Sequence, residues 1–186
     1  YVGMAKELCE QFPYANKIFE IANSVFDFNL REKCYNGPED ELAKTIYSQP
    51  AIFATSLCAL EATRESSILG SAVAGHSLGE YAAMVACDII TIEDGFKLIK
   101  ARSEAMQKAS ETAKGSMCAI IGPSAEEVEK ICSEVDGYVV PVNYNSSAQT
   151  VIAGEVEAVE KAIEIFAAQK AKAIKLNVSS AFHSKL

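Results

Sequence analysis

The spacing of apolar residues predicts that helices dominate the first part of the chain. Residues 2–12 and 14–26 each place apolar side chains at helical spacing, and Pro13 separates the two stretches. Pro50 suits the first position of a further helix that runs to about Glu65. Because apolar residues are dense in that helix, we expect it to be largely buried.

Strand-like patterning first appears after this helix. We expect a short strand over Ser71–Ala74, then a turn, a helix that starts near Glu80 and another helix over Ile92–Ala109.

Four short apolar segments predict a sheet in the last third of the chain. Ser124 and Glu127 form a capping box that opens a helix between the first two segments. Pro141 argues against a central position for its strand. The expected strands are Met117–Gly122, Tyr138–Asn143, Gln149–Gly154 and Lys172–Val178.

The order of these elements divides the protein into two parts, both of the α/β class. The order βαββαβ predicts a small ferredoxin-like subdomain over residues 114–178. Residues 1–113 and 179–186 then form a larger α/β subdomain into which the small one is inserted.

Composition and charge narrow the class of protein. With 49% apolar residues among 186, the chain can bury a sizeable core, and no apolar run approaches the roughly 18 residues of a membrane span. The net charge of −8 argues against nucleic acid. We therefore expect neither nucleic acid nor a membrane as a partner.

The six cysteines indicate a reducing compartment. None forms a C-x-x-C pair and most lie in apolar stretches, which is typical of reduced core cysteines in a cytoplasmic protein. Only His76 and His183 could add imidazole ligands, so we do not expect a metal site.

Gly75-His76-Ser77-Leu78-Gly79 fits the G-x-S-x-G pattern of a nucleophile elbow. Such a turn between a strand and a helix presents the serine hydroxyl outward, and its two glycines let the elements approach closely. The N–H of Leu78 would lie at the helix N-terminus, where free donors favour an oxyanion. Ser77 is therefore the candidate nucleophile, with a glycine-rich structural turn as the alternative.

A serine hydroxyl needs a base to act as a nucleophile. His76 is adjacent to Ser77, and neighbouring side chains on such a turn point in different directions. His183, just after the last expected strand, is the other histidine of the chain. We interpret His183 as the general base, in preference to a surface histidine.

Arg102 lies on the apolar side of its expected helix. It follows Ile99 by three residues and precedes Met106 by four, which places it on their stripe. A guanidinium that faces inward needs an anionic partner. An internal salt bridge or a snorkelling side chain is one interpretation, and a fork that binds a ligand carboxylate is the other.

Four groups of residues occur in an order that resembles a known family. They are the elbow with Glu80-Tyr81, Arg102 with Met106-Gln107, Asn143-Tyr144-Asn145 with Gln149, and Ala181-Phe182-His183-Ser184. Together they resemble the malonyl-CoA:acyl carrier protein transacylase family over essentially the whole chain. The resemblance implies a hydrolase-like large subdomain with a parallel sheet and a nucleophile elbow, beside the small ferredoxin-like subdomain.

The resemblance also implies a ping-pong transfer that needs no cofactor. Ser77 would attack malonyl-CoA with His183 as general base, and the phosphopantetheine thiol of acyl carrier protein would then take the malonyl group. Arg102 matches the family's arginine for the malonyl carboxylate, and Gln49 resembles a position near the pocket. Fatty acid biosynthesis is the implied setting, although polyketide assembly uses the same site.

The chain departs from the family pattern at both ends. It opens at Tyr1-Val2-Gly3-Met4, which resembles the residues just after the family's Gly-Gln-Gly-Ser-Gln loop, and it stops at Leu186. We therefore expect that this loop, with its second oxyanion donor, and a C-terminal segment are lacking here.

Two other functions stay open. An α/β-hydrolase-type serine esterase shares the elbow but needs an acidic residue for its triad, for which Asp88, Asp94 and Asp136 are available.

The second is a non-catalytic fragment that binds acyl carrier protein. Its docking surface would be a basic cluster, although ordinary solvated lysines are the favoured interpretation of these residues. The cluster consists of Lys170, Lys172, Lys175 and Lys185.

Overall fold

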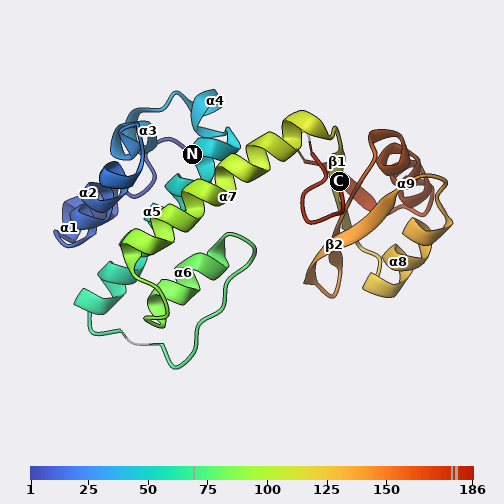
Figure 1. Ribbon diagram of the computed structural model, residues 1–186. Helices are drawn as coiled ribbons and strands as arrows, with labels where there is room; N and C mark the ends of the chain where they lie inside the picture. The colour runs from blue at the N-terminus through green and yellow to red at the C-terminus, as the bar shows by residue number, and fades with distance from the viewer. Residues whose placement is uncertain (69, 177, 179) are drawn as a thin grey trace. The chain divides into compact units, whose positions relative to one another are not determined.

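The computed structural model describes residues 1–68, 70–176, 178 and 180–186, and its ribbon is shown in Figure 1. The chain forms two compact units, Tyr1–Gln107 and Lys108–Leu186. The division falls within helix α7 (Ile92–Thr112), and residues 180–186, here called the C-terminal tail, group with the second unit. The subdomain boundaries expected for the whole protein stay a prediction.

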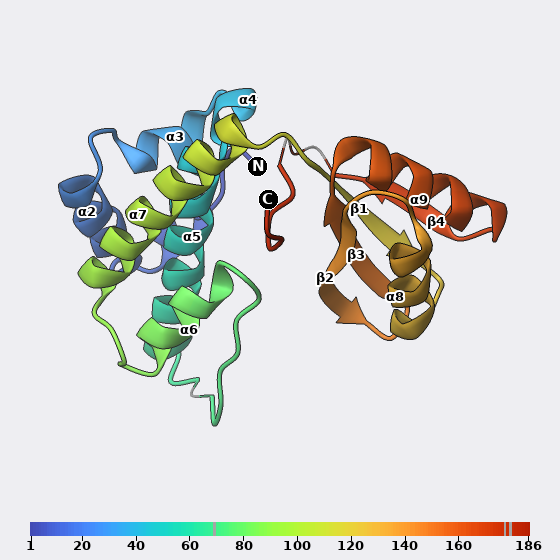
Figure 2. The same ribbon diagram turned by 45° about the vertical axis from the view of Figure 1, so that its right-hand side comes forward.

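The described part of the first unit is helical. Helix α5 packs against α2, α3 and α6, and it lies side by side with α7 (Figure 2). None of the helices that the structure describes combines the length and the apolar character of a membrane span. Before α7, the helices are α1 (Lys6–Gln11), α2 (Ala15–Val25), α3 (Leu30–Asn36), α4 (Glu39–Leu42), α5 (Thr45–Glu65) and α6 (Gly79–Ala86).

Aromatic rings join the two long helices of this unit. Phe53 of α5 and Phe96 of α7 meet edge to face with their centroids 4.9 Å apart, and both are buried. Gly95 allows this approach, because a Cβ there would lie 2.6 Å from the Phe53 ring. This contact fixes the relative positions of α5, which carries Gln49, and α7, which carries Arg102.

Helix α5 begins earlier than Pro50 predicts. It starts at Thr45, so Pro50 lies inside it. The fixed φ of proline is compatible with a helix, and Pro50 removes one backbone donor without ending α5. The expected burial is confirmed for Phe53 and Leu57, whereas Ile52 is 48% exposed.

The strand predicted over Ser71–Ala74 does not form. These four residues are exposed and lie outside any strand, and no strand occurs in residues 1–68 and 70–107. The predicted parallel sheet is therefore not present in the described part of the first unit. A strand needs a neighbour to hydrogen bond with, and an apolar segment such as the one around Val73 does not supply that neighbour.

The second unit contains an antiparallel sheet with two helices. The described strands lie in the order β2-β3-β1-β4. Along the chain the elements follow the predicted order βαββαβ. They are β1 (Ser116–Ile121), α8 (Ala125–Glu134), β2 (Val139–Ser146), β3 (Gln149–Gly154), α9 (Val156–Ala168) and β4 (Lys172–Lys175).

Two local predictions for this unit are confirmed. Ser124 and Glu127 form the capping box of α8, in which each side chain accepts a hydrogen bond from the other's backbone N–H. Pro141 lies in β2, at the edge of the sheet, beside a register shift between Pro141 and Asn143. An edge position suits proline because it has no N–H for a second neighbour.

The two faces of the sheet are covered by different segments. Helices α8 and α9 cover one face, where Val128 and Phe166 are fully buried. The other face packs against Ala181, Phe182 and Leu186 of the C-terminal tail. The tail that carries His183 is therefore anchored in the core of the second unit.

Candidate active site

Ser77 lies in a left-handed turn immediately before α6. Its φ is 54°, which non-glycine residues rarely adopt because it costs conformational energy. The N–H of Gly79 donates to the carbonyl of His76 at 2.9 Å, and α6 begins at Gly79. This is the strained turn before a helix that a nucleophile elbow requires, although no strand precedes it in the described residues.

Gly75 allows this turn to close. A Cβ on Gly75 would lie 2.2 Å from the backbone nitrogen of Glu80 and 2.2 Å from the carbonyl carbon of Gly79. Around the equivalent Cβ position of Gly79 there is open space to 4 Å. The steric role predicted for both glycines therefore applies to Gly75 and is wrong for Gly79.

Leu78 places its backbone N–H beside Ser77 at the start of α6. It is the N-cap residue of that helix, so its N–H lies at the positive end of the helix dipole. The role of Leu78 as an oxyanion donor stays a prediction.

The guanidinium of Arg102 contacts the hydroxyl of Ser77. Nη2 of Arg102 donates to Ser77 Oγ at 3.0 Å. The other terminal nitrogen, Nη1, donates to Oε1 of Gln49, and the guanidinium carbon lies 5.9 Å from the centre of the Tyr81 ring. Three residues that the sequence singles out, Ser77, Arg102 and Gln49, thus meet in one place, here called the Ser77 cluster.

Arg102 lies at the margin of the buried side of α7. Phe96, Ile99 and Ser103 of this helix are buried, whereas Arg102 is half-buried beside them. No carboxylate of the described residues forms an ion pair with Arg102. The interpretation as an internal salt bridge is therefore wrong, and the guanidinium faces a hydroxyl and an amide instead.

Gln49 is the buried partner of Arg102. It is only 6% exposed, its Oε1 accepts from Arg102, and its Nε2 donates to Sδ of Met106 at 3.1 Å. An amide accepts at one end and donates at the other, so the two contacts together orient the side chain. Gln49 therefore contacts the guanidinium, and its predicted role in substrate binding is not tested by this geometry.

His183 lies in the C-terminal tail of the second unit, whereas the Ser77 cluster belongs to the first. Its side chain is exposed and its φ is 62°, another left-handed conformation. The pairing of His183 with Ser77 stays a prediction.

Tyr81 lies near Arg102 and Met106 contacts Gln49, although the sequence names these two residues only as part of the family pattern and not as site residues. Met106 follows Arg102 by four positions within α7. Residues four apart along a helix lie on one face. That spacing is the signal that could have found Met106.

The three aspartates available for a hydrolase triad have surface partners. Asp88 forms an ion pair at 3.7 Å with an arginine of α5, and Asp136 forms one at 3.4 Å with a lysine of α9. Asp94 accepts a hydrogen bond at 2.8 Å from the threonine before α7. All three are exposed, whereas the acid of a triad is a buried group that orients the histidine.

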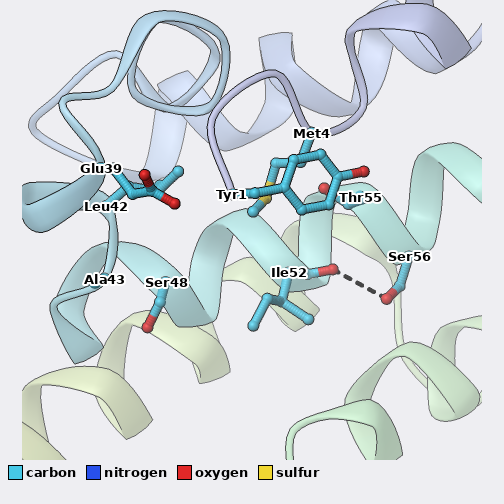
Figure 3. Close-up of a pocket in the computed structure, with 9 residues that line it drawn as sticks. All are labelled: Tyr1, Met4, Glu39, Leu42, Ala43, Ser48, Ile52, Thr55 and Ser56. Atoms are coloured by element: carbon cyan, nitrogen blue, oxygen red, sulfur yellow. Dashed lines mark hydrogen bonds between the residues drawn. The ribbon is translucent and has the colours of Figure 1, made fainter. Parts of the chain in front are cut away.

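A separate cavity of about 420 Å³ lies in the first unit (Figure 3). Met4, Leu42 and Ile52 contribute apolar walls, and Tyr1 forms part of the rim. None of the site residues that the sequence singles out lines this cavity. It is therefore distinct from the Ser77 cluster.

The thiols of the chain are reduced, and most are buried. All six cysteines are free, and Cys87 is the exposed one. Burial raises the pKa of Cys34 to about 12 and that of Cys132 to about 11. No group of three or more metal-binding side chains occurs in the part of the chain that the structure describes.

Known proteins match this chain over its whole length. A family model described as an acyl transferase domain matches residues 1–186. The malonyl CoA-acyl carrier protein transacylases of Bacillus subtilis (strain 168) and Escherichia coli (strain K12) are each 38% identical to it over 100% of the chain. The crystal structure of such a transacylase from Clostridium perfringens superposes with a TM-score of 0.92 at 38% identity, covering 100% of this chain and 59% of that one.

The chain therefore belongs to the acyl transferase domain family and has its α/β fold. It spans 60% of the length of the Bacillus subtilis relative and 61% of the Escherichia coli relative. A further similar structure, with a TM-score of 0.91 and 39% identity over 97% of this chain and 60% of that one, is a malonyl-transacylase in complex with the acyl-carrier protein of a type II polyketide synthase.

Proposed function

We propose that the protein transfers a malonyl group from malonyl-CoA to the phosphopantetheine thiol of acyl carrier protein, through a malonyl ester of Ser77. The observation that carries this proposal is the 3.0 Å contact between Arg102 Nη2 and Ser77 Oγ. Among the described residues Arg102 has no carboxylate partner, and such a cation beside a nucleophile is suited to an acyl group that brings its own carboxylate. Relatives that bear the name of this activity support the assignment.

In the first half-reaction Ser77 Oγ attacks the thioester carbonyl and passes its proton to His183. The N–H of Leu78 stabilises the oxyanion, and the tetrahedral intermediate collapses with loss of coenzyme A, which takes the proton from His183. In the second half-reaction the carrier protein's thiol gives its proton to His183 and attacks the ester carbonyl. Ser77 then leaves and recovers the proton.

Arg102 selects the acyl group in this scheme. Its guanidinium forms two parallel hydrogen bonds with the malonyl carboxylate, and it exchanges its contact with the unreacted Ser77 hydroxyl to do so. An acetyl group leaves the half-buried guanidinium without that anion, so acetyl transfer is penalised. Gln49 contributes to substrate binding through the guanidinium.

The proposal extends to fold and setting. In the whole protein residues 1–113 and 179–186 belong to a hydrolase-like subdomain with a parallel sheet, and residues 114–178 form a ferredoxin-like subdomain, for which the element order is the support. Six reduced thiols agree with a cytoplasmic location. The reaction uses no cofactor, and its setting is fatty acid biosynthesis.

A carrier-protein transfer assay tests the proposed function. The protein is incubated with malonyl-CoA, freed of excess reagent and then mixed with phosphopantetheinylated acyl carrier protein, and both masses are followed. We expect a malonyl adduct that moves to the carrier protein and that never forms in Ser77→Ala. Release of free malonate instead would indicate an esterase, and carrier-protein binding without any adduct would indicate docking alone.

A further inference from the structure

The turn that carries His183 is held by contacts on both of its sides. His183 has a φ of 62° and an exposed side chain. The residues on either side of it are each tied to the second unit or to one another. A strained residue persists in this way only when its surroundings determine its conformation.

The segment before His183 is fixed by close packing. Ser180 and Ala181 are 1% and 0% exposed. The tail packs directly against Gly115, just before β1. A Cβ on Gly115 would lie 2.5 Å from the backbone nitrogen of Ala181, so only glycine allows this approach. The tail therefore enters the turn at a fixed point on the sheet.

The hydroxyl of Ser184 closes the turn around His183. It donates to the carbonyl of Ala181 at 2.5 Å and accepts from the N–H of Leu186 at 3.2 Å. One side chain thus joins the backbone before His183 to the backbone after it. Such side-chain to backbone bonds stabilise turns that the backbone alone does not favour.

Tyr138 holds the far side of the same turn. Its hydroxyl accepts from the N–H of Lys185 at 3.2 Å, and the Lys185 ammonium lies 4.0 Å from the centre of its ring. Tyr138 is itself fixed by Glu155, whose carboxylate accepts from the Tyr138 N–H at 3.0 Å and whose N–H donates to the Tyr138 carbonyl at 2.8 Å. The start of α9 is thereby connected to the His183 turn.

We propose that Ser184 and Tyr138 are positioning residues that hold the His183 turn in its left-handed conformation, so that the imidazole projects from the second unit in one direction. The inference rests on the proposed function in that it takes His183 as the general base. A general base that is displaced by about an ångström loses much of its efficiency. Loss of either hydroxyl should therefore lower the rate of transfer.

Amide hydrogen exchange in the full chain tests the positioning directly. Ser184→Ala should speed exchange at the Leu186 N–H, and Tyr138→Phe should speed exchange at the Lys185 N–H, each by about tenfold, the value of one ordinary hydrogen bond. Ser133→Ala and Tyr144→Phe are matched controls, because their hydroxyls bond within α8 and to Glu129. Unchanged exchange in both test variants overturns the inference, whatever the activity.

Kinetics separate positioning from a general loss of structure. Ser184→Ala and Tyr138→Phe should each lower the kcat of malonyl transfer by about tenfold with little change in KM. Ser184→Thr retains the hydroxyl and should restore kcat. Unchanged kcat in both variants, or a threonine variant as slow as the alanine variant, overturns the inference. An unmodified protein that forms no malonyl adduct contradicts the proposed function instead, and exchange still decides whether the hydroxyls hold the turn.

Discussion

Arg102 and Ser77, separated by 25 positions in the sequence, are joined by a 3.0 Å hydrogen bond from Nη2 to Oγ. The bond connects the long helix α7 with the turn before α6. In a malonyl ester of Ser77 a single methylene separates the ester carbonyl from the free carboxylate. The carboxylate is therefore within reach of this guanidinium. The contact therefore links the identity of the nucleophile to the charge of the acyl group.

Arg102→Ala should lower malonyl transfer far more than acetyl transfer. Without the guanidinium, malonyl transfer should fall by about 100-fold, as expected for a charge-assisted hydrogen bond that is lost in a half-buried site. Acetyl transfer should not fall, because acetyl has no carboxylate to pair and the variant removes the unpaired guanidinium that penalises it. Competition between malonyl-CoA and acetyl-CoA measures the ratio of malonyl to acetyl transfer. Equal losses on both substrates would contradict the pairing of Arg102 with the malonyl carboxylate.

Gln49→Glu should disable Arg102 without removing it. The new carboxylate lies where the amide oxygen now accepts from Nη1, so it forms an internal ion pair that competes with the substrate. We expect the KM for malonyl-CoA to rise by about tenfold while acetyl transfer is unaffected. Met106→Leu is the matched control, because a thioether is only a weak acceptor for the Gln49 amide. An unchanged KM in Gln49→Glu would show that this oxygen does not compete for the guanidinium.

Gly75→Ala and Gly79→Ala should differ sharply in stability. The added methyl at position 75 would lie 2.2 Å from backbone atoms, whereas the one at position 79 meets open space to 4 Å. We expect a loss of about 3 kcal/mol in the free energy of unfolding for the first variant. The second should be neutral or slightly stabilising, since alanine favours the helix. Urea unfolding of the pair gives the answer, and equal losses would contradict the close approach at Gly75.

The sequence predicted local features of this site better than the architecture around them. The elbow is recognisable because glycines and a serine at fixed spacing imply a tight turn, and the φ of 54° at Ser77 agrees with that. The parallel sheet was not predictable from Ser71–Ala74, because strand pairing depends on neighbours that a local pattern does not contain. The hydrogen bond between Arg102 and Gln49 was likewise not predictable from a local pattern, because Gln49 lies on another helix, 53 positions earlier.

Stability should fall at alkaline pH because of the buried thiols. Burial raises the pKa of Cys34 to about 12 and of Cys132 to about 11, from the ordinary 9.0. Above about pH 9 the unfolded chain therefore binds fewer protons than the folded one, so the free energy of unfolding decreases as pH rises. Urea unfolding at about pH 8 and about pH 10 measures the decrease, which Cys132→Ala should reduce and Cys87→Ala, at an exposed position, should not. A decrease that is the same in Cys132→Ala would assign the effect to other groups.

The most direct test of the central claim, that Ser77 carries the acyl group beside Arg102, is peptide mass spectrometry after incubation with malonyl-CoA. We predict a malonyl group on the peptide that contains Ser77, none in Ser77→Ala, and a strong decrease in Arg102→Ala that acetyl-CoA does not reproduce. A malonyl group on any other residue, or labelling that persists in Ser77→Ala, would contradict the account.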